Sequence, residues 1–245
     1  MNALILAAGF GTRLGEFGVN TPKGLIRTAS GRVILEILMN DLVKLPSIER
    51  ICLVTNERFV EIYKKWLSKI NLSERVEIFS NAVTEPEKRN GALKDLYLSL
   101  TQFNLENNDL LVCPSDTYYG FSLEKFIKYC KKEDTSFVTV VKQMEFLDEI
   151  KNRLGCAIVK KNRIVDFIEK PSVPPSLFGA VPFYYYPKSY LTLVGNYIGQ
   201  GGNVDAPGSI IPWLIREGKK VFAFKTKGSW IDVGTIKDVR NLQKH

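Results

Sequence analysis

The sequence predicts an α/β fold built on a mostly parallel sheet that is flanked by helices. Through residue 142, short apolar runs alternate with segments that carry apolar side chains at helical spacing. The first run, residues 3–8, is almost wholly apolar, which is typical of a strand buried on both faces of a parallel sheet. After Gly155 two strand-like runs follow each other directly, which indicates a smaller β-rich lobe joined to the same sheet. We expect residues 1–245 to form a single domain.

The apolar runs and helical patterns place the elements of the first half. We expect buried strands at residues 3–8, 50–55, 76–80, 109–113 and 136–142, and a short edge strand at 25–28. The same patterns predict helices at residues 33–45, 58–70, 91–103 and 123–131. Because strands and helices alternate, the strands should be joined by right-handed crossovers. In such sheets a ligand lies beyond the carboxyl ends of the strands.

The second half reads differently from the first. Two strand-like runs meet at Lys161-Asn162, which predicts a hairpin, and residues 175–187 form an aromatic strand. We expect helices at residues 190–198 and 209–217, a strand at 220–225, and a C-terminal helix after residues 230–234. No linker, repeat or low-complexity tract interrupts the chain. The second half should therefore add its strands to the sheet of the first half and not form a separate domain.

Composition excludes several classes of function. The only histidine is His245, which excludes a histidine general base, a Ser-His-Asp triad and a histidine-rich metal site. The four cysteines form no Cys-x-x-Cys pair, which is typical of reduced, buried cysteines in a cytoplasmic protein. Neither a signal peptide nor a membrane span is expected. The net charge of +8 comes from scattered lysines, so we expect no nucleic-acid partner.

A glycine loop follows the first strand. Gly9 and Gly11 lie in a tight turn, where missing Cβ atoms let backbone N–H groups approach phosphate oxygens. Arg13 adds a guanidinium that can bind phosphate in a bidentate way, and Lys23 adds a point charge on an exposed loop. The spacing matches neither the dinucleotide loop nor the Walker A loop. The residues alone leave two readings open, a triphosphate cradle or a tight turn with two solvated cations.

The longer segment resembles a known family. Leu-Ala-Ala-Gly-x-Gly-Thr-Arg-Leu followed by Pro-Lys-Gly-Leu resembles the signature of the sugar-phosphate nucleotidylyltransferases. The resemblance implies a Rossmann-like fold that joins a nucleoside triphosphate to a sugar 1-phosphate and releases pyrophosphate. It implies catalytic roles for Arg13 and Lys23. The nucleotide-binding residues would then be Leu6, Ala7, Ala8, Gly9, Gly11, Thr12, Arg13, Lys23, Asn90, Gly91 and Asp116.

Two aspartates end apolar runs and are candidate metal ligands. Asp116 closes the run before it, and Asp232 stands two residues before Gly234, which allows a sharp turn. Taken alone, each could be a helix cap or turn residue. Mg²⁺ bound to phosphate takes one or two protein carboxylates and keeps several waters. Both segments resemble family motifs whose aspartates share Mg²⁺, although Ser115 stands where a glycine is common.

The hairpin carries a candidate acceptor site. Glu169-Lys170-Pro171 resembles a family segment in which the glutamate binds sugar hydroxyls and the lysine binds the sugar phosphate. Gly155 matches the glycine before that hairpin, and Ala180 lies in the segment that often reads sugar hydroxyls. Without the resemblance, Glu169 and Lys170 would be interpreted as solvent-exposed residues at the end of a strand. The resemblance makes this β-rich part the sugar-side lobe.

Asn90-Gly91 precedes the helix expected at residues 91–103. Asn90 should cap that helix, because asparagine is favoured at this position. The resemblance also places a base-contacting loop here, where Gly91 would let the backbone reach the edge of the base. The charged approach at residues 85–89 leaves the base preference open.

Three alternatives remain open. The acceptor could be a non-sugar phosphate, such as phosphocholine or inositol phosphate, used by a cytidylyltransferase. The chain could be a nucleotide-sensing subunit without catalysis, which an intact set of Arg13, Lys23, Asp116 and Asp232 disfavours. A nucleic-acid binder rests only on the net charge. No further catalytic domain is expected after the last helix, which predicts a single activity, and the sequence leaves homo-oligomer formation open.

Overall fold

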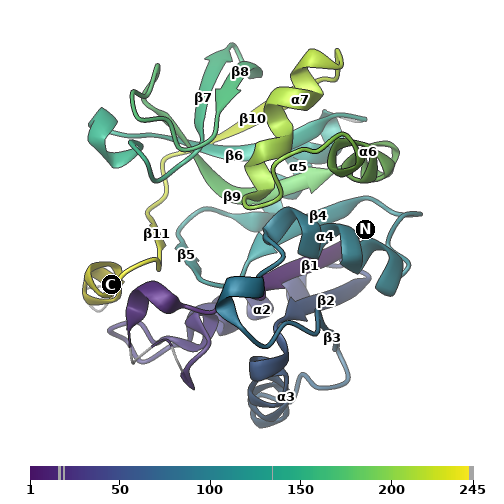
Figure 1. The fold of residues 1–245 in the computed structure, drawn as a ribbon, viewed down its shortest axis with the longest axis vertical. Helices are drawn as coiled ribbons and strands as arrows, with labels where there is room; N and C mark the ends of the chain where they lie inside the picture. Colours follow the sequence, from purple (N-terminus) through teal and green to yellow (C-terminus); the bar gives the residue numbers. More distant parts are fainter. Residues whose placement is uncertain (16–17, 19, 134, 243–245) are drawn as a thin grey trace.

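The computed structural model describes residues 1–15, 18, 20–133 and 135–242 of the chain, so His245 lies outside the described residues. The strands are β1 (Asn2–Ala7), β2 (Arg50–Thr55), β3 (Val76–Ser80), β4 (Leu110–Pro114), β5 (Thr117–Tyr119), β6 (Phe137–Gln143), β7 (Cys156–Lys160), β8 (Arg163–Ile168), β9 (Phe178–Tyr186), β10 (Val221–Thr226) and β11 (Trp230–Asp232). Within these residues, one sheet has the order β3-β2-β1-β4-β9-β6-β10-β8-β7. Figure 1 shows β1, β2 and β3 at one end of the molecule and β7, β8 and β10 at the other.

The first half of the sheet is parallel, as the alternation of strands and helices predicts. β1 pairs in parallel with β2 on one side and with β4 on the other, and β2 pairs in parallel with β3. All of these strands run in one direction, so their carboxyl ends share one edge. That edge carries the loop after Ala7 and the loop after Pro114.

The second half of the sheet is mixed. β9 runs antiparallel to β4, β6 and β7, and the β7–β8 hairpin is also antiparallel. A parallel return would need a long crossover, usually a helix, and the described chain between β6 and β9 contains only a short 3₁₀ turn and the hairpin. β10 restores a parallel pairing beside β6. The β-rich lobe is therefore continuous with the parallel half.

Helices cover both faces of the sheet. The helices are α2 (Ile34–Lys44), α3 (Val60–Lys69), α4 (Ala92–Gln102), α5 (Leu123–Lys132), α6 (Lys188–Gly199), α7 (Ile211–Arg216) and α8 (Ile236–Leu242). α2, α3 and α5 pack on one face, and α4, α6 and α7 pack on the other. Alternate residues of β1 enter the two cores, since Leu4 faces one and Ile5 the other. Burial on both faces explains why these strands read as unbroken apolar runs.

A small second sheet was not predicted. β5 and β11 pair antiparallel, and β11 descends from the β-rich lobe to α8, which is marked by the C-terminus in Figure 1. Val233 and Leu242 then pack with Leu14, Ile26 and Ile34 of the N-terminal region. The end of the described chain is thereby anchored beside the start.

The edge strand expected at residues 25–28 is wrong. Residues 23–25 form a 3₁₀ turn, and only a single bridge joins Arg27 to Val33. The N–H groups of Leu25 and Ile26 bond back to the carbonyls of Pro22 and Lys23, so they cannot pair with a strand.

The remaining elements are found where they were predicted, with small shifts at the ends. The helices expected at 58–70 and 209–217 each begin with a 3₁₀ turn before α3 and α7. The four cysteines are buried and unpaired. Among the described residues, no helix combines the length and apolar character needed to cross a membrane.

Candidate functional site

The loop after β1 opens onto empty space at Gly9. A Cβ atom placed there would meet no other heavy atom within 4 Å, so packing does not require a glycine at this position. Gly11 differs, because its φ of 67° favours glycine and a Cβ would lie 3.4 Å from Gly18. The N–H groups of Phe10, Gly11 and Thr12 donate no hydrogen bond to another described residue. The loop thus presents free backbone donors beside open space, as a phosphate cradle needs.

Two cavities meet at this loop. The first, which we call the glycine-loop cavity, has a volume of about 470 Å³ and is lined by residues 8–13, Lys23, Pro86, Arg89, Lys170 and Asp205. The second, the central cavity, has a volume of about 310 Å³ and runs between β1, α4 and the β-rich lobe. Ala8, Gly9, Arg89, Lys170 and Asp205 line both cavities. A ligand that fills one can therefore extend into the other.

Most of the residues selected from the sequence line these cavities. The central cavity is lined by Leu6, Ala8, Gly9, Gly91, Asp116, Gly155, Glu169, Lys170, Ala180 and Asp232, and the glycine-loop cavity by Gly11, Thr12, Arg13 and Lys23 as well. Ala7 lines neither cavity and is buried within the sheet. Asn90 also lines neither and faces a separate hollow on the surface.

The fold brings Asp116 and Asp232 together. Asp116 precedes β5, Asp232 ends β11, and Asp232 pairs with Thr117 across the two-stranded sheet. The N–H of Val233 also donates to the carbonyl of Asp116 at 3.0 Å. Burial first, and then the charge of Asp116, raise the pKa of Asp232 to about 6, while Lys23 and Arg13 act in the opposite direction. Two carboxylates that disfavour each other's charge call for a cation between them.

Lys23 supplies one such cation. Its Nζ lies 3.1 Å from Asp116 Oδ2, and its side chain is only 14% exposed. The following Gly24 permits this approach, because a Cβ there would lie 2.8 Å from the carbonyl oxygen of Ser115. The expectation of an exposed, solvated lysine is therefore wrong. Tertiary packing of the Pro22-Lys23-Gly24 turn against Ser115 buries the side chain.

Arg13 also lies near Asp232, although no ion pair joins the two side chains among the described residues. A Cβ added at Gly234 would lie 3.7 Å from both Arg13 Nη2 and Asp232 Oδ2. Gly234 therefore leaves room for the guanidinium to come close to the aspartate. The charges of Arg13 and Lys23 both lower the pKa of Asp232, so both cations lie close to it.

The pair of aspartates fits Mg²⁺. Carboxylate oxygens are the ligands that this hard cation prefers, and at a phosphate site it needs only one or two of them. Within the described residues, no group of three or more histidine, cysteine, aspartate or glutamate side chains is arranged to hold a metal. Two protein carboxylates, with phosphate and water oxygens completing the shell, match this donor set.

Glu169 lines the central cavity, and its carboxylate packs against two glycines. A Cβ at Gly155 would lie 3.2 Å from Glu169 Oε2, and one at Gly208 would lie 2.5 Å from it. Burial raises the pKa of Glu169, the charge of Lys170 lowers it, and that of Asp205 raises it. A Cβ at Gly155 would also collide with the ring of Phe167. A glycine is therefore needed there so that Phe167 can pack behind Glu169. The N–H of Ala180 donates to the carbonyl of Gly155 at 2.8 Å, which ties β9 to this wall.

Asn90 does not cap α4, so that prediction is wrong. Its Nδ2 donates to Asp95 Oδ1 at 3.1 Å instead. The first N–H groups of α4 are taken by a distant loop, since Ala92 donates to the carbonyl of Asp205 and Leu93 to that of Val204. Gly91 has a φ of 88° and abuts the carbonyl of Val204, so only glycine fits there. The backbone of a loop far along the sequence replaces the side-chain cap.

Sequence reasoning missed several polar residues at the site. Asp95 is buried, lines the central cavity, and accepts at Oδ1 from both Asn81 and Asn90. Arg89 and Asp205 line both cavities. Arg89 and Asp205 stand on loops without a motif, while Asp95 lies in α4, and the charged stretch at 85–89 was the only sequence signal.

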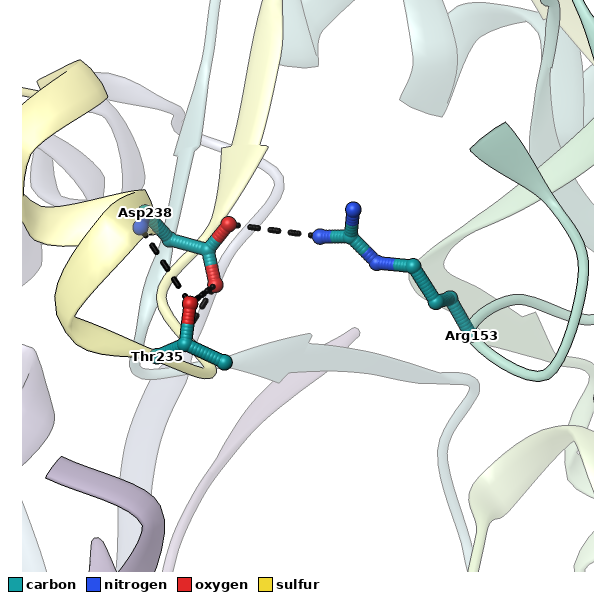
Figure 2. A network of polar contacts seen from close by, with 3 residues as sticks. All are labelled: Arg153, Thr235 and Asp238. Carbon is teal, nitrogen blue, oxygen red and sulfur yellow. Dashed lines mark hydrogen bonds and ion pairs between the residues drawn. The ribbon is translucent and has the colours of Figure 1, made fainter. Parts of the chain in front are cut away.

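A further network joins the β-rich lobe to α8. Figure 2 shows Arg153 reaching Asp238, which also holds Thr235. Arg153 Nη2 lies 3.2 Å from Asp238 Oδ1, while Asp238 Oδ2 accepts from the N–H and hydroxyl of Thr235 at 2.8 and 2.7 Å. Thr235 and Asp238 thus cap the start of α8. The Thr-x-x-Asp spacing is a sequence signal for this cap that could have been read.

Comparisons with known proteins identify relatives of this chain. Among curated relatives, the glucose-1-phosphate adenylyltransferases of Thermotoga neapolitana and Mycoplasma mobile are 29% and 24% identical over 96% of this chain. The chain spans 58% and 64% of the lengths of these two relatives. These shares mean that a large part of each relative has no counterpart here.

Two solved structures share the fold. A Bacillus anthracis protein assigned as a glucose-1-phosphate thymidylyltransferase gives a TM-score of 0.81 at 19% identity, covering 100% of this chain and 94% of that one. The inositol-1-phosphate CTP transferase of T. maritima gives 0.76 at 17% identity, covering 99% and 94%. Residues 2–245 match the model of the nucleotidyl transferase family. The chain therefore belongs to the nucleotidyl transferase family.

Proposed function

We propose that this protein transfers a nucleoside monophosphate from a nucleoside triphosphate to a sugar 1-phosphate and releases pyrophosphate. The observation that carries the proposal is the meeting of Asp116 and Asp232, which line the central cavity, with Lys23, which lines the glycine-loop cavity. One cavity has the glycine loop and cations suited to phosphates, and the other has a carboxylate suited to hydroxyl groups. The relatives named above, which act on glucose 1-phosphate by name, support this reading.

The glycine-loop cavity would hold the triphosphate. Free N–H groups at residues 10–12 would donate to phosphate oxygens, and Arg13 and Lys23 would neutralise charge that develops on the leaving pyrophosphate. The base would lie toward Gly91 and the end of β1, at the start of the central cavity. The positive φ of Gly91 sets the loop that would meet the base.

The central cavity would hold the acceptor. Glu169 would accept hydrogen bonds from sugar hydroxyls, and Lys170 would bind the sugar phosphate. Gly155 and Ala180 would form a wall without bulky side chains beside the sugar. The acceptor phosphate would then lie between Lys170 and the aspartate pair.

The reaction forms one bond and breaks one. An oxygen of the acceptor phosphate attacks the α-phosphorus of the triphosphate, and the bond from that phosphorus to the bridging oxygen of pyrophosphate breaks. The second pKa of a phosphate monoester is near ~6, so the acceptor is largely ionised at neutral pH and needs no general base. This agrees with the absence of histidine from the described residues, since the one histidine of the sequence, His245, lies beyond them. Catalysis would rest on alignment and on charge stabilisation by Arg13 and Lys23.

Asp116 and Asp232 would hold Mg²⁺. When bound there, the ion would supply charge neutralisation at the α-phosphate. The two aspartates would fix its place at the junction of the cavities, and Lys23 would leave Asp116 for a phosphate oxygen.

Three further features belong to the proposal. The unbroken sheet supports a single domain over residues 1–245, and the family match over residues 2–245 supports the same view. Reduced, buried cysteines support a cytoplasmic location. Neither nucleic acid nor a membrane is proposed as a partner.

A pyrophosphate-release screen tests the proposal. The four common nucleoside triphosphates would be combined with a panel of sugar 1-phosphates, with and without Mg²⁺. Release that requires both a triphosphate and a sugar 1-phosphate is the expected result. Turnover with inositol phosphate or phosphocholine, and none with a sugar, would assign the alternative acceptor class. Triphosphate binding without release by any acceptor would indicate a nucleotide-sensing subunit.

A further inference from the structure

A cluster of three charged residues stands where the two cavities join. Arg89, Lys170 and Asp205 line both cavities and come from three separate loops. Asp205 Oδ1 lies 3.6 Å from Arg89 Nη2, and Asp205 Oδ2 lies 3.9 Å from Lys170 Nζ. One carboxylate thus faces two cations, one with each oxygen.

The backbone around Asp205 is fixed, although its side chain is not enclosed. The carbonyl of Asp205 accepts from the N–H of Ala92 at 3.2 Å, and its N–H donates to Asn203 Oδ1 at 2.9 Å. These bonds hold the loop against the first turn of α4. The side chain of Asp205 is 54% exposed and that of Arg89 is 67% exposed. The backbone therefore holds Asp205 beside the cavities, while its exposed side chain is free to rotate away from Arg89 and Lys170.

The two ion pairs are loose. Charge-assisted N–H to carboxylate bonds are usually about 2.7–2.9 Å long, well below the distances found here. Exposed pairs of this kind add little to stability, because water screens them. Stabilising the fold is therefore a poor explanation for placing a carboxylate between two cations in a cavity. A role in ligand exchange explains it better.

The charge of the glycine-loop cavity favours an anion. Among the described residues that line it, Arg13, Lys23, Arg89 and Lys170 are cations and Asp205 is the acidic side chain. Phosphate oxygens are strong acceptors that carry more charge than a single carboxylate. A guanidinium with one loose partner keeps several N–H donors free for such oxygens. A polyphosphate in this cavity would compete directly with Asp205 for Arg89.

We propose that Arg89 is a further phosphate-binding residue, and that Asp205 is the internal counter-ion that an entering polyphosphate displaces. The identity of the ligand as the polyphosphate end of a nucleoside triphosphate rests on the proposed function. Arg89 binds the phosphates from the side opposite the glycine loop. Asp205 lowers affinity for the polyphosphate, because its pairs with Arg89 and Lys170 must break first.

Binding of inorganic pyrophosphate to the full chain tests the proposal. Isothermal titration calorimetry would compare wild type with Arg89→Ala, Asp205→Asn and the double variant. Arg89→Ala should weaken pyrophosphate binding by roughly 10-fold or more, the scale of one charge-assisted bond. Asp205→Asn should tighten it several-fold, and this gain should shrink in the double variant, where Arg89 is absent. A structural role for the cluster predicts no tightening.

Lys88 provides a matched control. It neighbours Arg89, lines neither cavity, and pairs with Glu85 at 2.9 Å. Lys88→Ala removes the same charge and should leave pyrophosphate affinity unchanged. Equal losses in Lys88→Ala and Arg89→Ala would reduce the effect to overall charge and overturn the proposal.

The remaining outcomes separate this inference from the proposed function. If wild type binds no pyrophosphate, or if Arg89→Ala binds it normally while Lys23→Ala does not, the role of Arg89 is refuted. In the second case the function remains as proposed. If Arg89→Ala loses affinity but no acceptor supports pyrophosphate release, Arg89 is a phosphate-binding residue and nucleotidylyl transfer to an acceptor is refuted.

Discussion

The two halves of the sheet build the site by different means. In the parallel half, the site consists mainly of backbone, with N–H groups at residues 10–12 that donate to no other described residue and open space at Gly9. In the mixed half, it consists of side chains on the ends of strands, with Glu169 and Lys170 after β8. Backbone donors suit a ligand part common to all nucleoside triphosphates. Side chains suit a ligand part that varies, so changes in acceptor choice should map to the second half.

The aspartate pair belongs to neither half alone and should give the largest effect. Asp116→Asn or Asp232→Asn should each lower Mg²⁺-dependent turnover by about 10³-fold, the upper end for loss of one preorganised electrostatic group. The double variant should be little worse than either single, because two ligands of one ion act as a unit. Measuring kcat/KM against Mg²⁺ concentration decides this. If the losses in kcat/KM of the two single variants multiply in the double variant, and the Mg²⁺ concentration at half-maximal activity is unchanged, the two aspartates do not share one ion.

Lys23 tests the parallel half through a side chain. Lys23→Ala should lower kcat by roughly 10²-fold, because one preorganised cation at the leaving pyrophosphate is lost. It should also weaken stability, since Asp116 and Asp232 lose a buried partner. Steady-state kinetics and thermal unfolding measure the two effects, with Lys88→Ala as the control. Wild-type turnover in Lys23→Ala would remove its catalytic role.

Glu169 tests whether the mixed half reads the acceptor. Glu169→Ala should raise the KM for the sugar phosphate by about 10- to 100-fold, because hydroxyls that it accepts from would lose a partner. The KM for the triphosphate should stay within two-fold of wild type. If the KM for the triphosphate rises instead, Glu169 contacts the triphosphate, and the mixed half does not select the acceptor through this residue.

Gly9 and Gly11 sharpen the description of the parallel half. A methyl at Gly9 enters open space, so Gly9→Ala should keep wild-type stability but raise the KM for the triphosphate by roughly 10-fold. Gly11→Ala should instead lower stability by about 1 kcal/mol or more, because its φ is positive. Thermal unfolding and steady-state kinetics on both variants distinguish a loss of space for the ligand, which raises KM, from backbone strain, which lowers stability. Equal stability losses would show that Gly9 serves folding.

Asp238 should give the smallest effect on turnover and a moderate effect on stability. Asp238→Ala removes the cap of α8 and the partner of Arg153, so it should cost about 1–2 kcal/mol. Arg153→Ala should cost less than 1 kcal/mol, because its side chain is 58% exposed. Chemical denaturation of both variants measures this order. An Arg153→Ala variant as unstable as Asp238→Ala would make the ion pair, and not the cap, the main contribution.

The sequence predicted what local pattern determines. Strands β2 and β3 were placed at their observed bounds, because the run of β2 is apolar on both faces and that of β3 carries Val76, Ile78 and Phe79. Asp116 and Asp232 were selected from motifs, although their proximity depends on the pairing of β5 with β11, which no local pattern indicates. Arg89 and Asp205 were missed because only tertiary structure brings their loops together. The antiparallel direction of β9 was also hidden, since strand direction leaves no trace in apolar spacing.

The pairing of β11 with β5 has a consequence for how the protein becomes active during synthesis. Chains emerge from the ribosome with the N-terminal part first, and that part can begin to fold before the rest exists. The glycine loop and Asp116 belong to the early part, but Asp232 arrives late, on the three residues of β11 that pair with β5. A nascent chain can therefore form a phosphate cradle well before its second carboxylate arrives. The proposed transfer activity should appear only once β11 has docked on β5, after the glycine loop can first bind a phosphate.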